Sequence, residues 1–234
     1  MEKMLLLLYI YILTSQEVLG YVLTQLAKSM GTNTLPTGPT TKVKRYYSVN
    51  GIINRYFVSP LVTVLNYQWI ISSSKVVFEL HEFDILNLMY TIPVMVMMGE
   101  FLFYISHRFM HSHPAVYRCI HKSHHEVTHP TDGWEDIIDS HPIEIILLVL
   151  TLSPCLTLYM LPTRSIHVIT IVFVQVMNMF LAIVGHTRVD FTWTLFGREI
   201  FSSHFHAGHH AKFKYNYGAN FAFFDKLFGT FTTI

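Results

Sequence analysis

Three clusters of histidine have a spacing that could bind metal ions. The sequence holds 15 histidines in 234 residues, and eight of them form one HxxxH and two HxxHH motifs. On a helix, positions i, i+3 and i+4 share one face, so we expect each cluster to direct two or three imidazoles at one point. Neutral imidazole binds zinc, iron, copper and nickel well. The candidate ligands are His107, His111, His121, His124, His125, His206, His209 and His210.

The number of candidate ligands indicates more than one metal ion. Eight imidazole nitrogens exceed the four ligands of a tetrahedral zinc site. They would suit two metal ions, each with a coordination position left open. The sequence therefore predicts a dimetal site.

Two further histidines are candidate ligands. His186 lies at the end of an apolar segment, where an ionisable residue indicates a functional role. His141 precedes Pro142 at the start of another apolar segment, and it could be a ligand or a residue that begins a helix. We expect the other histidines to lie outside the site, and these are His81, His113, His129, His167 and His204.

Carboxylates near the clusters could orient the imidazoles. Glu100, Tyr104, His107 and His111 are spaced i, i+4, i+7 and i+11, which forms one polar stripe on a helix. Metal-bound histidines usually donate their second N–H to an acceptor such as a carboxylate, so we expect this role for Glu100. The alternative is that Glu100 pairs with another polar group inside the bundle. Asp225 and Asp190 are further candidates.

The composition is that of a membrane protein. Charged residues make up 13% of the chain and apolar ones 51%, with a mean hydropathy of +0.38, whereas soluble domains carry roughly 25% charged residues. The formal charge of +1 gives no indication of a nucleic-acid partner. The two cysteines, Cys119 and Cys155, form neither a disulfide framework nor a CxxC metal pair.

Four apolar segments are long enough, or nearly so, to cross a bilayer, which takes about 20 helical residues. They cover residues 56–72, 85–106, 143–161 and 165–185. A fifth, residues 4–26, could be a short span, an interfacial helix or a cleaved signal, and the lack of a small-residue cleavage site favours a retained segment. We expect an all-α membrane protein of about four transmembrane helices in two hairpins.

Charges in the loops predict the orientation of these spans. Residues 27–55 contain five basic residues and no acid, which is typical of a cytoplasmic loop; they are Lys28, Lys42, Lys44, Arg45 and Arg55. Residues 107–142 and those after 186 then also face the cytosol, where they would form a helical cap that holds the metals. We divide the chain into an N-terminal membrane-associated segment with its basic loop, 1–55, and a catalytic domain, 56–234.

The motifs together resemble those of the fatty acid hydroxylase/sterol desaturase superfamily, the membrane histidine-box diiron oxygenases. The resemblance covers about residues 85–234 and lies in three stretches. These are Glu100 to His111, Tyr117 to Glu126, and His206 to Thr230 with its Tyr215–Asn216–Tyr217–Gly218 and Phe224–Asp225 elements. The eight clustered histidines match the family's ligands, and His186 matches a further histidine between its second and third boxes.

The resemblance implies an enzyme of the endoplasmic reticulum, if the source is eukaryotic, with two irons as cofactor. It would use O₂ to hydroxylate or desaturate a lipid that enters from the bilayer. No His–Pro–Gly–Gly haem motif occurs in these residues, so the electrons would come from a separate b-type cytochrome or reductase. The His141–Pro142–Ile143–Glu144 element resembles the sterol branches, which favours a C4-methyl sterol oxidase or C5-desaturase. The alternative is a fatty acyl or sphingolipid hydroxylase.

Other classes of membrane metalloprotein fit these motifs less well. A zinc hydrolase would need an HExxH motif or a comparable base, but Arg108, Lys122 and Ala207 follow the leading histidines. A metal transporter or metal-binding protein should place its ligands in the middle of the bilayer, whereas these clusters fall at the ends of the predicted spans. A family member without catalytic activity is not indicated, because all three motifs are intact.

Overall fold

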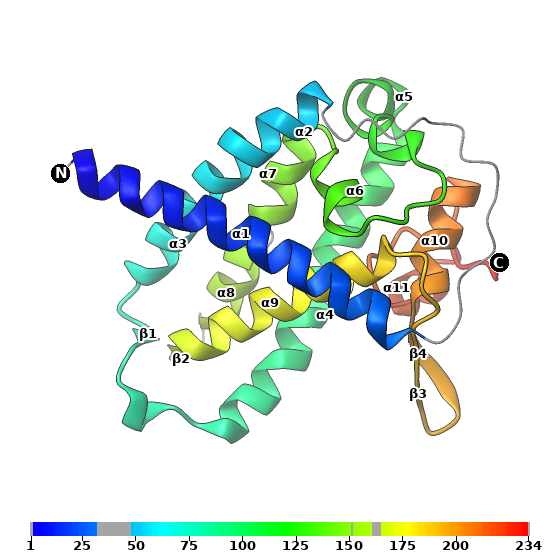
Figure 1. The fold of residues 1–234 in the computed structure, drawn as a ribbon. Coiled ribbons are helices and arrows are strands. Elements are labelled where there is room, and N and C mark those ends of the chain that lie inside the picture. The colour runs from blue at the N-terminus through cyan, green and yellow to red at the C-terminus, as the bar shows by residue number, and fades with distance from the viewer. Residues whose placement is uncertain (1, 32–47, 151, 161–164, 234) are drawn as a thin grey trace.

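The computed structural model describes residues 2–31, 48–150, 152–160 and 165–233, and it is mainly helical (Figure 1). The longer helices are α1 (Glu2–Met30), α3 (Ser59–Ile71), α4 (Ile85–Ser112), α7 (Pro142–Leu150), α8 (Leu152–Met160), α9 (Val168–Gly185) and α10 (Ser203–Lys212). The shorter ones are α2 (Val49–Ile53), α5 (Pro114–Val116), α6 (Trp134–Ile138), α11 (Phe223–Leu227), the π-helices η1 (Asn54–Val58) and η3 (Tyr117–His121), and the 3-10 helices η2 (Leu80–Glu82) and η4 (His124–Glu126).

Four short strands among the described residues form two small sheets, neither of which was expected from the sequence. β1 (Val76–Val77) pairs in parallel with β2 (Ile166–His167), and this pairing joins the segment before α4 to the start of α9. β3 (Thr192–Leu195) and β4 (Arg198–Ser202) form an antiparallel hairpin that follows α9. The histidine-rich α10 begins directly after β4.

Three helical segments among the described residues are long and apolar enough to cross a membrane. They are α4, the α7–α8 segment around residue 151, and α9. They correspond to three of the four expected spans. A buried apolar cluster packs α3, α4, α8 and α9 together, with Met95, Leu156, Ile171 and Val174 at its centre. α4 continues to Ser112, so its last turns carry the HxxxH motif beyond the expected end of the span.

The expected span at residues 56–72 is helical but differs from the other three. α3 has 13 residues and continues from α2 through η1, and it is not among the helices that meet the length of a span. Its polar side chains are used in packing. The Asn66 amide donates to the Val149 carbonyl of α7, and Asn54 in η1 donates to the carbonyls of Ile138 and Ser140. The domain boundary expected between residues 55 and 56 falls inside η1.

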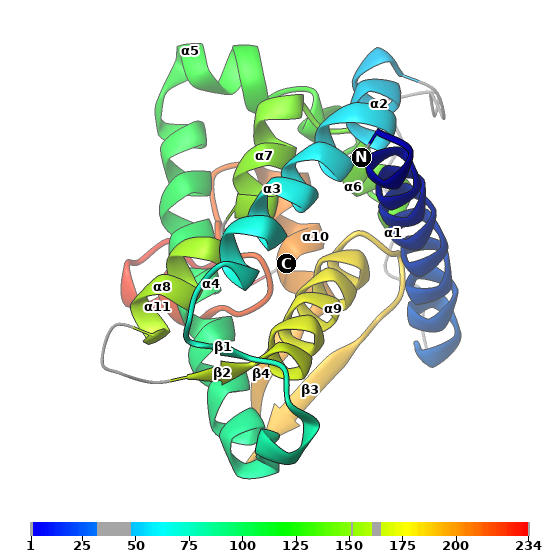
Figure 2. The ribbon, with the colours of Figure 1, turned by 90° about the vertical axis from the view of Figure 1, so that its left-hand side faces the viewer.

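α1 lies across the helical bundle, on the side opposite α4 (Figure 2). It packs against α3 and α9. The polar residues that interrupt its apolar sequence face the protein: Gln16 bonds to Thr63 and Ser59, and Glu17 accepts from the Trp134 indole. Its outer face carries exposed apolar side chains, which are Tyr11, Val18, Tyr21 and Val22.

Two predicted features lie outside the described residues. Lys42, Lys44 and Arg45 of the basic loop belong to residues 32–47, and the expected turn of the second helical hairpin covers residues 161–164. The remaining basic residues of that loop, Lys28 and Arg55, are both in ion pairs with residues of α1, α6 or the chain just before α6.

Removal of the Arg55 guanidinium should loosen the attachment of α1. Arg55 pairs with Glu17 of α1 and, at 2.6 Å, with Glu135 of α6, and only 19% of its side chain is exposed. An Arg55→Met variant leaves two carboxylates without their cation, which should cost about 1–3 kcal/mol. We expect a clear drop in the midpoint of thermal unfolding in detergent.

Lys28→Met is the matched control, because the Lys28–Asp132 pair is longer, at 3.8 Å, and its lysine is 39% exposed. Exposed pairs contribute about 0–1 kcal/mol. Equal midpoint shifts in the two variants would contradict a special role of Arg55.

Candidate metal centre

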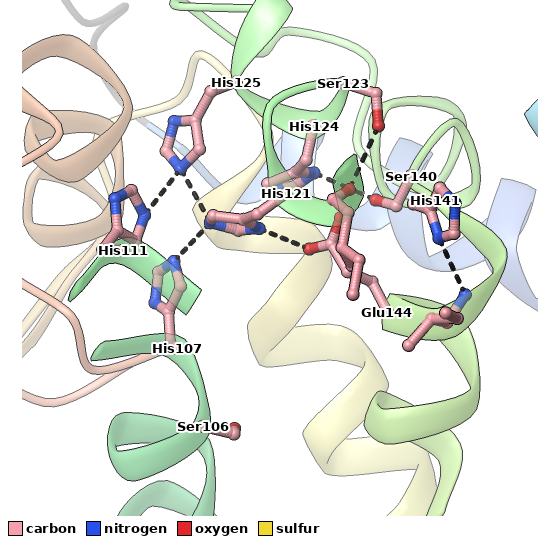
Figure 3. Close-up of polar contacts among 12 residues, drawn as sticks. Ser106, His107, His111, His121, Ser123, His124, His125, Ser140, His141 and Glu144 are labelled. Carbon is pink, nitrogen blue, oxygen red and sulfur yellow. Dashed lines mark hydrogen bonds and ion pairs between the residues drawn. The ribbon is translucent and has the colours of Figure 1, made fainter. Parts of the chain in front are cut away.

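The clustered histidines come from separate segments that meet at one end of the spans. His107 and His111 lie on the last turns of α4, and His186 follows α9 directly. The second cluster occupies the end of η3 and the turn η4, and the third lies on α10. Figure 3 shows the rings of His107, His111, His121 and His125 pointing toward one another, with His124 turned toward Ser140.

Nine histidines form two groups, and each group could hold a metal ion. The first group is His107, His111, His121, His125 and His209, and the second is His124, His186, His206 and His210. Within each group, one nitrogen from every ring lies within 4.8 Å of the others. The structure therefore brings together all eight histidines of the three motifs, and His186 with them.

Each HxxHH motif contributes to both groups, which differs from the expectation that a cluster points at one site. His206 and His210 belong to the second group and His209 to the first. Adjacent helical positions differ by about 100° around the axis, so the rings at i+3 and i+4 diverge to either side of the ring at i. His121 and His125 likewise share the first group, while His124 enters the second.

Hydrogen bonds fix the orientation of six of these rings through Nδ1. In five of them Nδ1 lies 2.6–3.0 Å from a backbone carbonyl or carboxylate oxygen, to which it can only donate. These pairs are His107 with Tyr217, His121 with Glu144, His186 with Ala182, His209 with Tyr215, and His210 with Val127. His124 donates to the Ser140 hydroxyl oxygen, whose own proton goes to Ile137. In a neutral ring Nε2 then carries no proton and presents a lone pair.

In each group, two such lone pairs face each other. Nε2 of His107 is 2.9 Å from Nε2 of His121, and Nε2 of His124 is 3.4 Å from Nε2 of His186. Neither pair can share a hydrogen bond while both rings are neutral, because both Nδ1 protons are already donated. Two acceptors at this distance repel each other unless a cation lies between them. Each group thus has the electrostatics of a cation site.

The spacing of the nitrogens also fits metal coordination. The close Nε2–Nε2 contacts within the groups range from 2.9 to 3.4 Å. Ligands about 2.1 Å from one ion, with angles of roughly 90–110° between them, lie about 3.0–3.4 Å apart. The residues present therefore fit two metal ions held by imidazole nitrogens.

Burial keeps these rings in the neutral form that a metal requires. Desolvation lowers the pKa of His186 to about 4, and it lowers the pKa of His209 to about 3 against the opposing effect of its bond to Tyr215. The pKa values of His124, His206 and His210 also fall well below the ordinary value, first through desolvation and then through neighbouring imidazoles. At neutral pH the site offers lone pairs rather than positive charge.

Glu100 and Asp225 do not contact an imidazole; instead they hold the loop that follows α10. Buried Glu100 accepts from the backbone N–H groups of Asn220 and Phe221, at 3.0 and 3.1 Å. Asp225 accepts from the N–H groups of Tyr217 and Gly218, both at 2.8 Å, and from the Thr230 hydroxyl. For Glu100, this is the alternative in which it pairs with a polar group inside the bundle.

The loop in turn orients two of the candidate ligands. The carbonyls of Tyr217 and Tyr215 are the acceptors for His107 and His209. Glu100 and Asp225 therefore affect the site indirectly, by holding the backbone segment that carries these carbonyls. A side chain at Gly218 would interfere, because an added Cβ would lie 2.7 Å from the Glu100 carboxylate. These two carboxylates are positioning residues.

The remaining candidates lie apart from both groups. His141 directly precedes α7, where its Nδ1 accepts from the Ile143 N–H, as in the alternative role considered for it. Asp190 pairs with His204 at 3.2 Å, while the Nδ1 proton of His186 goes to Ala182. The other histidines expected outside the site are absent from both groups, and these are His81, His113, His129 and His167.

The orienting roles of two side chains were not predicted from the sequence, although Glu144 was noted there as part of the His141–Pro142–Ile143–Glu144 element. The Glu144 carboxylate lies 2.6 Å from Nδ1 of His121, and Ser140 accepts from His124 (Figure 3). Glu144 lies in the first turn of α7, and its place two residues after a proline that begins a helix was the available signal. Ser140 gives no such signal, because its role arises only where the turn before α7 meets η4.

The family model described as "Fatty acid hydroxylase" matches residues 92–230. This range includes all nine histidines of the two groups, together with Glu100, Glu144 and Asp225. No solved structure matches the chain.

Several curated relatives are similar to this chain over half of its length or more. A methylsterol monooxygenase of Aspergillus fumigatus is 31% identical over 62% of this chain and 48% of its own length. A C-4 methylsterol oxidase of Schizosaccharomyces pombe is 31% identical over 54% of this chain and 42% of its own. A cholesterol 25-hydroxylase-like protein of Danio rerio is 26% identical over 74% of this chain and 66% of its own. The chain thus spans about half the length of most of these relatives.

Loss of the Glu144 charge should weaken metal binding without removing a ligand. In a Glu144→Gln variant the neutral amide no longer increases the basicity of the His121 nitrogen that would bind the metal. Replacement of such partners typically costs 10–100-fold in metal affinity. We expect faster loss of metal during dialysis against a graded series of chelator concentrations, followed by elemental analysis.

Glu82→Gln, in the loop before α4, is the control, because its carboxylate is half exposed and far along the chain from both groups. If Glu144→Gln retained metal as well as Glu82→Gln, the orienting role of Glu144 would be wrong.

Proposed function

The chain belongs to the fatty acid hydroxylase family, and on that premise we propose that it is a membrane-bound oxidoreductase that uses O₂ and two irons to oxidise a sterol-like lipid. The observation that carries the proposal is the pair of facing Nε2 lone pairs in each histidine group, His107 with His121 and His124 with His186. Both need a cation, and both lie within the matched region.

The choice of iron rests on the relatives. Imidazole alone does not decide between zinc, copper, nickel and iron. The matched relatives are named monooxygenases, an oxidase, a hydroxylase, a hydroxylase-like protein and a desaturase, and such reactions need a redox metal or another redox cofactor. Two bound irons would supply the O₂-dependent oxidation of an unactivated C–H bond. The protein's part is to hold them with neutral imidazoles and to fix those rings through Glu144, Ser140 and backbone carbonyls.

A sterol is the favoured class of substrate. The names of the matched relatives refer to methylsterols, cholesterol or a Delta(7)-sterol, in fungi, an amoeba and vertebrates. Most of these names describe a monooxygenase, an oxidase or a hydroxylase and one describes a desaturase, so we favour hydroxylation over desaturation. A fatty acyl or sphingolipid substrate is the alternative within the same family.

The place of the two groups supports a lipid substrate and a separate electron donor. The ligands lie on the last turns of α4 and just after α9, at the ends of two candidate spans. A lipid could present one carbon there from the bilayer, while a b-type cytochrome or reductase approaches from the aqueous side. We place that side in the cytosol and, in a eukaryote, the membrane in the endoplasmic reticulum.

The same position argues against a metal transporter, whose site should lie near the middle of the bilayer. A zinc hydrolase would need a carboxylate free to act as base. The carboxylate nearest to the ligands, Glu144, is instead bonded to His121.

Turnover should depend on His186 but not on His141. His186 belongs to the second group, whereas His141 lies outside both groups and caps α7. We expect cells that express the wild-type protein to accumulate an oxidised sterol under air but not without O₂. His186→Ala should lower the product at least tenfold, and His141→Ala should retain most of it, as measured by mass spectrometry of extracted lipids.

An oxidised fatty acyl chain in place of a sterol would select the alternative substrate. No O₂-dependent lipid product in cells that contain metal-loaded wild-type protein would overturn the oxidase assignment. Equal losses in the two histidine variants would contradict the ligand role of His186.

A further inference from the structure

The β3–β4 hairpin carries an exposed apolar surface that plays no part in the metal centre. It follows α9, and its base is fixed by Phe191 and Phe201, which pack into the buried cluster formed with Leu181 and Val184 of α9. Beyond that base, Trp193, Leu195, Phe196 and Ile200 are exposed. Phe196, at the tip, is 95% exposed.

The turn of the hairpin places Phe196 where a polar residue would be easier to accommodate. Leu195 pairs with Arg198, so Phe196 and Gly197 form a two-residue loop with φ of 50° and 71°. Two-residue turns with positive φ at both positions favour Asn-Gly or Asp-Gly, and bulky residues are uncommon there. A phenylalanine at this position therefore indicates that an apolar side chain at the tip has a functional role.

The hairpin projects back along the spans rather than away from them. In Figures 1 and 2 its tip points in the same direction as the first residues of α4, away from the end that carries the histidines. Its base adjoins the end of α9, one of the candidate spans, six residues after Gly185. The exposed apolar side chains of the hairpin thus lie beside the end of a candidate span.

The backbone limits how deep such a hairpin can go. A two-stranded sheet has unpaired N–H and C=O groups along both outer edges, and these cannot be satisfied within the hydrocarbon core. Trp193 is of the type enriched at the membrane–water interface, whereas Leu195 and Phe196 are of the type that enters the acyl region. This favours shallow insertion.

We propose that the β3–β4 hairpin is a membrane anchor, with Phe196 and Leu195 inserted among the upper acyl carbons of the leaflet nearest the metal centre. The occupant of this apolar surface is lipid, not a partner protein. The proposal does not depend on the reaction that the enzyme performs, because no residue of the hairpin belongs to either histidine group.

Depth-dependent quenching of a fluorophore tests the proposal. In a Cys119→Ser background, which removes the exposed thiol, a Phe196→Cys variant would carry an environment-sensitive NBD label. The full chain, with its metal content verified, is placed in phosphatidylcholine nanodiscs that contain lipid with a nitroxide at acyl carbon 5 or 12. We expect blue-shifted emission and stronger quenching by the carbon-5 probe than by the carbon-12 probe.

Two labelled positions calibrate the measurement. Phe173→Cys, exposed on α9, reports a lipid-facing site, and His81→Cys, whose side chain is 81% exposed before α4, reports water. Emission and quenching at residue 196 like those at residue 81 would overturn the proposal. Stronger quenching by the carbon-12 probe would contradict shallow insertion.

Discussion

The structure depends on one electrostatic constraint: nine imidazoles direct nitrogen atoms inward at two points, and at least one facing pair in each group consists of two hydrogen-bond acceptors. Such an arrangement is unfavourable without a cation, because buried polar atoms need a partner. Protonation would relieve the repulsion only by placing charge where burial opposes it. The fold resists this by anchoring Nδ1 of six rings elsewhere, which leaves metal binding as the way to satisfy the inward nitrogens.

The rest of the bundle can be understood as support for these anchors. α4 and α9 bring His107, His111 and His186 to one end of the spans. The loop after α10 supplies two carbonyl acceptors, and Glu100 and Asp225 hold that loop by its backbone N–H groups. α7 supplies Glu144 to His121, and the chain just before it supplies Ser140 to His124. The ligands thus require all of these segments in place at once.

The sequence predicted which histidines lie together far better than it predicted the groups that orient them. Spacing alone identified the eight histidines of the motifs, and an ionisable residue at the end of a span identified His186. In the third motif, which lies on α10, the split between two groups follows from helix geometry. In the second motif the chain passes from a π-helix at His121 to a 3-10 turn at His124 and His125, which the pattern did not indicate. The acceptors at Tyr215, Tyr217, Ala182 and Val127 are backbone atoms, so no side-chain pattern could reveal them.

Among the membrane elements, long uniform apolar segments were predicted correctly, as at α4 and α9. Residues 56–72 were harder to assign, because a polar residue such as Asn66 is unusual in a membrane span. In the structure its amide donates to the Val149 carbonyl of α7. The β3–β4 hairpin was missed, since its short strands lack the length of a periodic signal.

The most direct test is iron X-ray absorption on purified protein of known metal content. The account predicts two irons per chain, one for each histidine group. Their nearest neighbours should be nitrogen or oxygen at about 2.1 Å, with the outer-shell scattering of several imidazoles and no sulfur. One metal per chain, a sulfur ligand, or a folded and active protein without metal would contradict it.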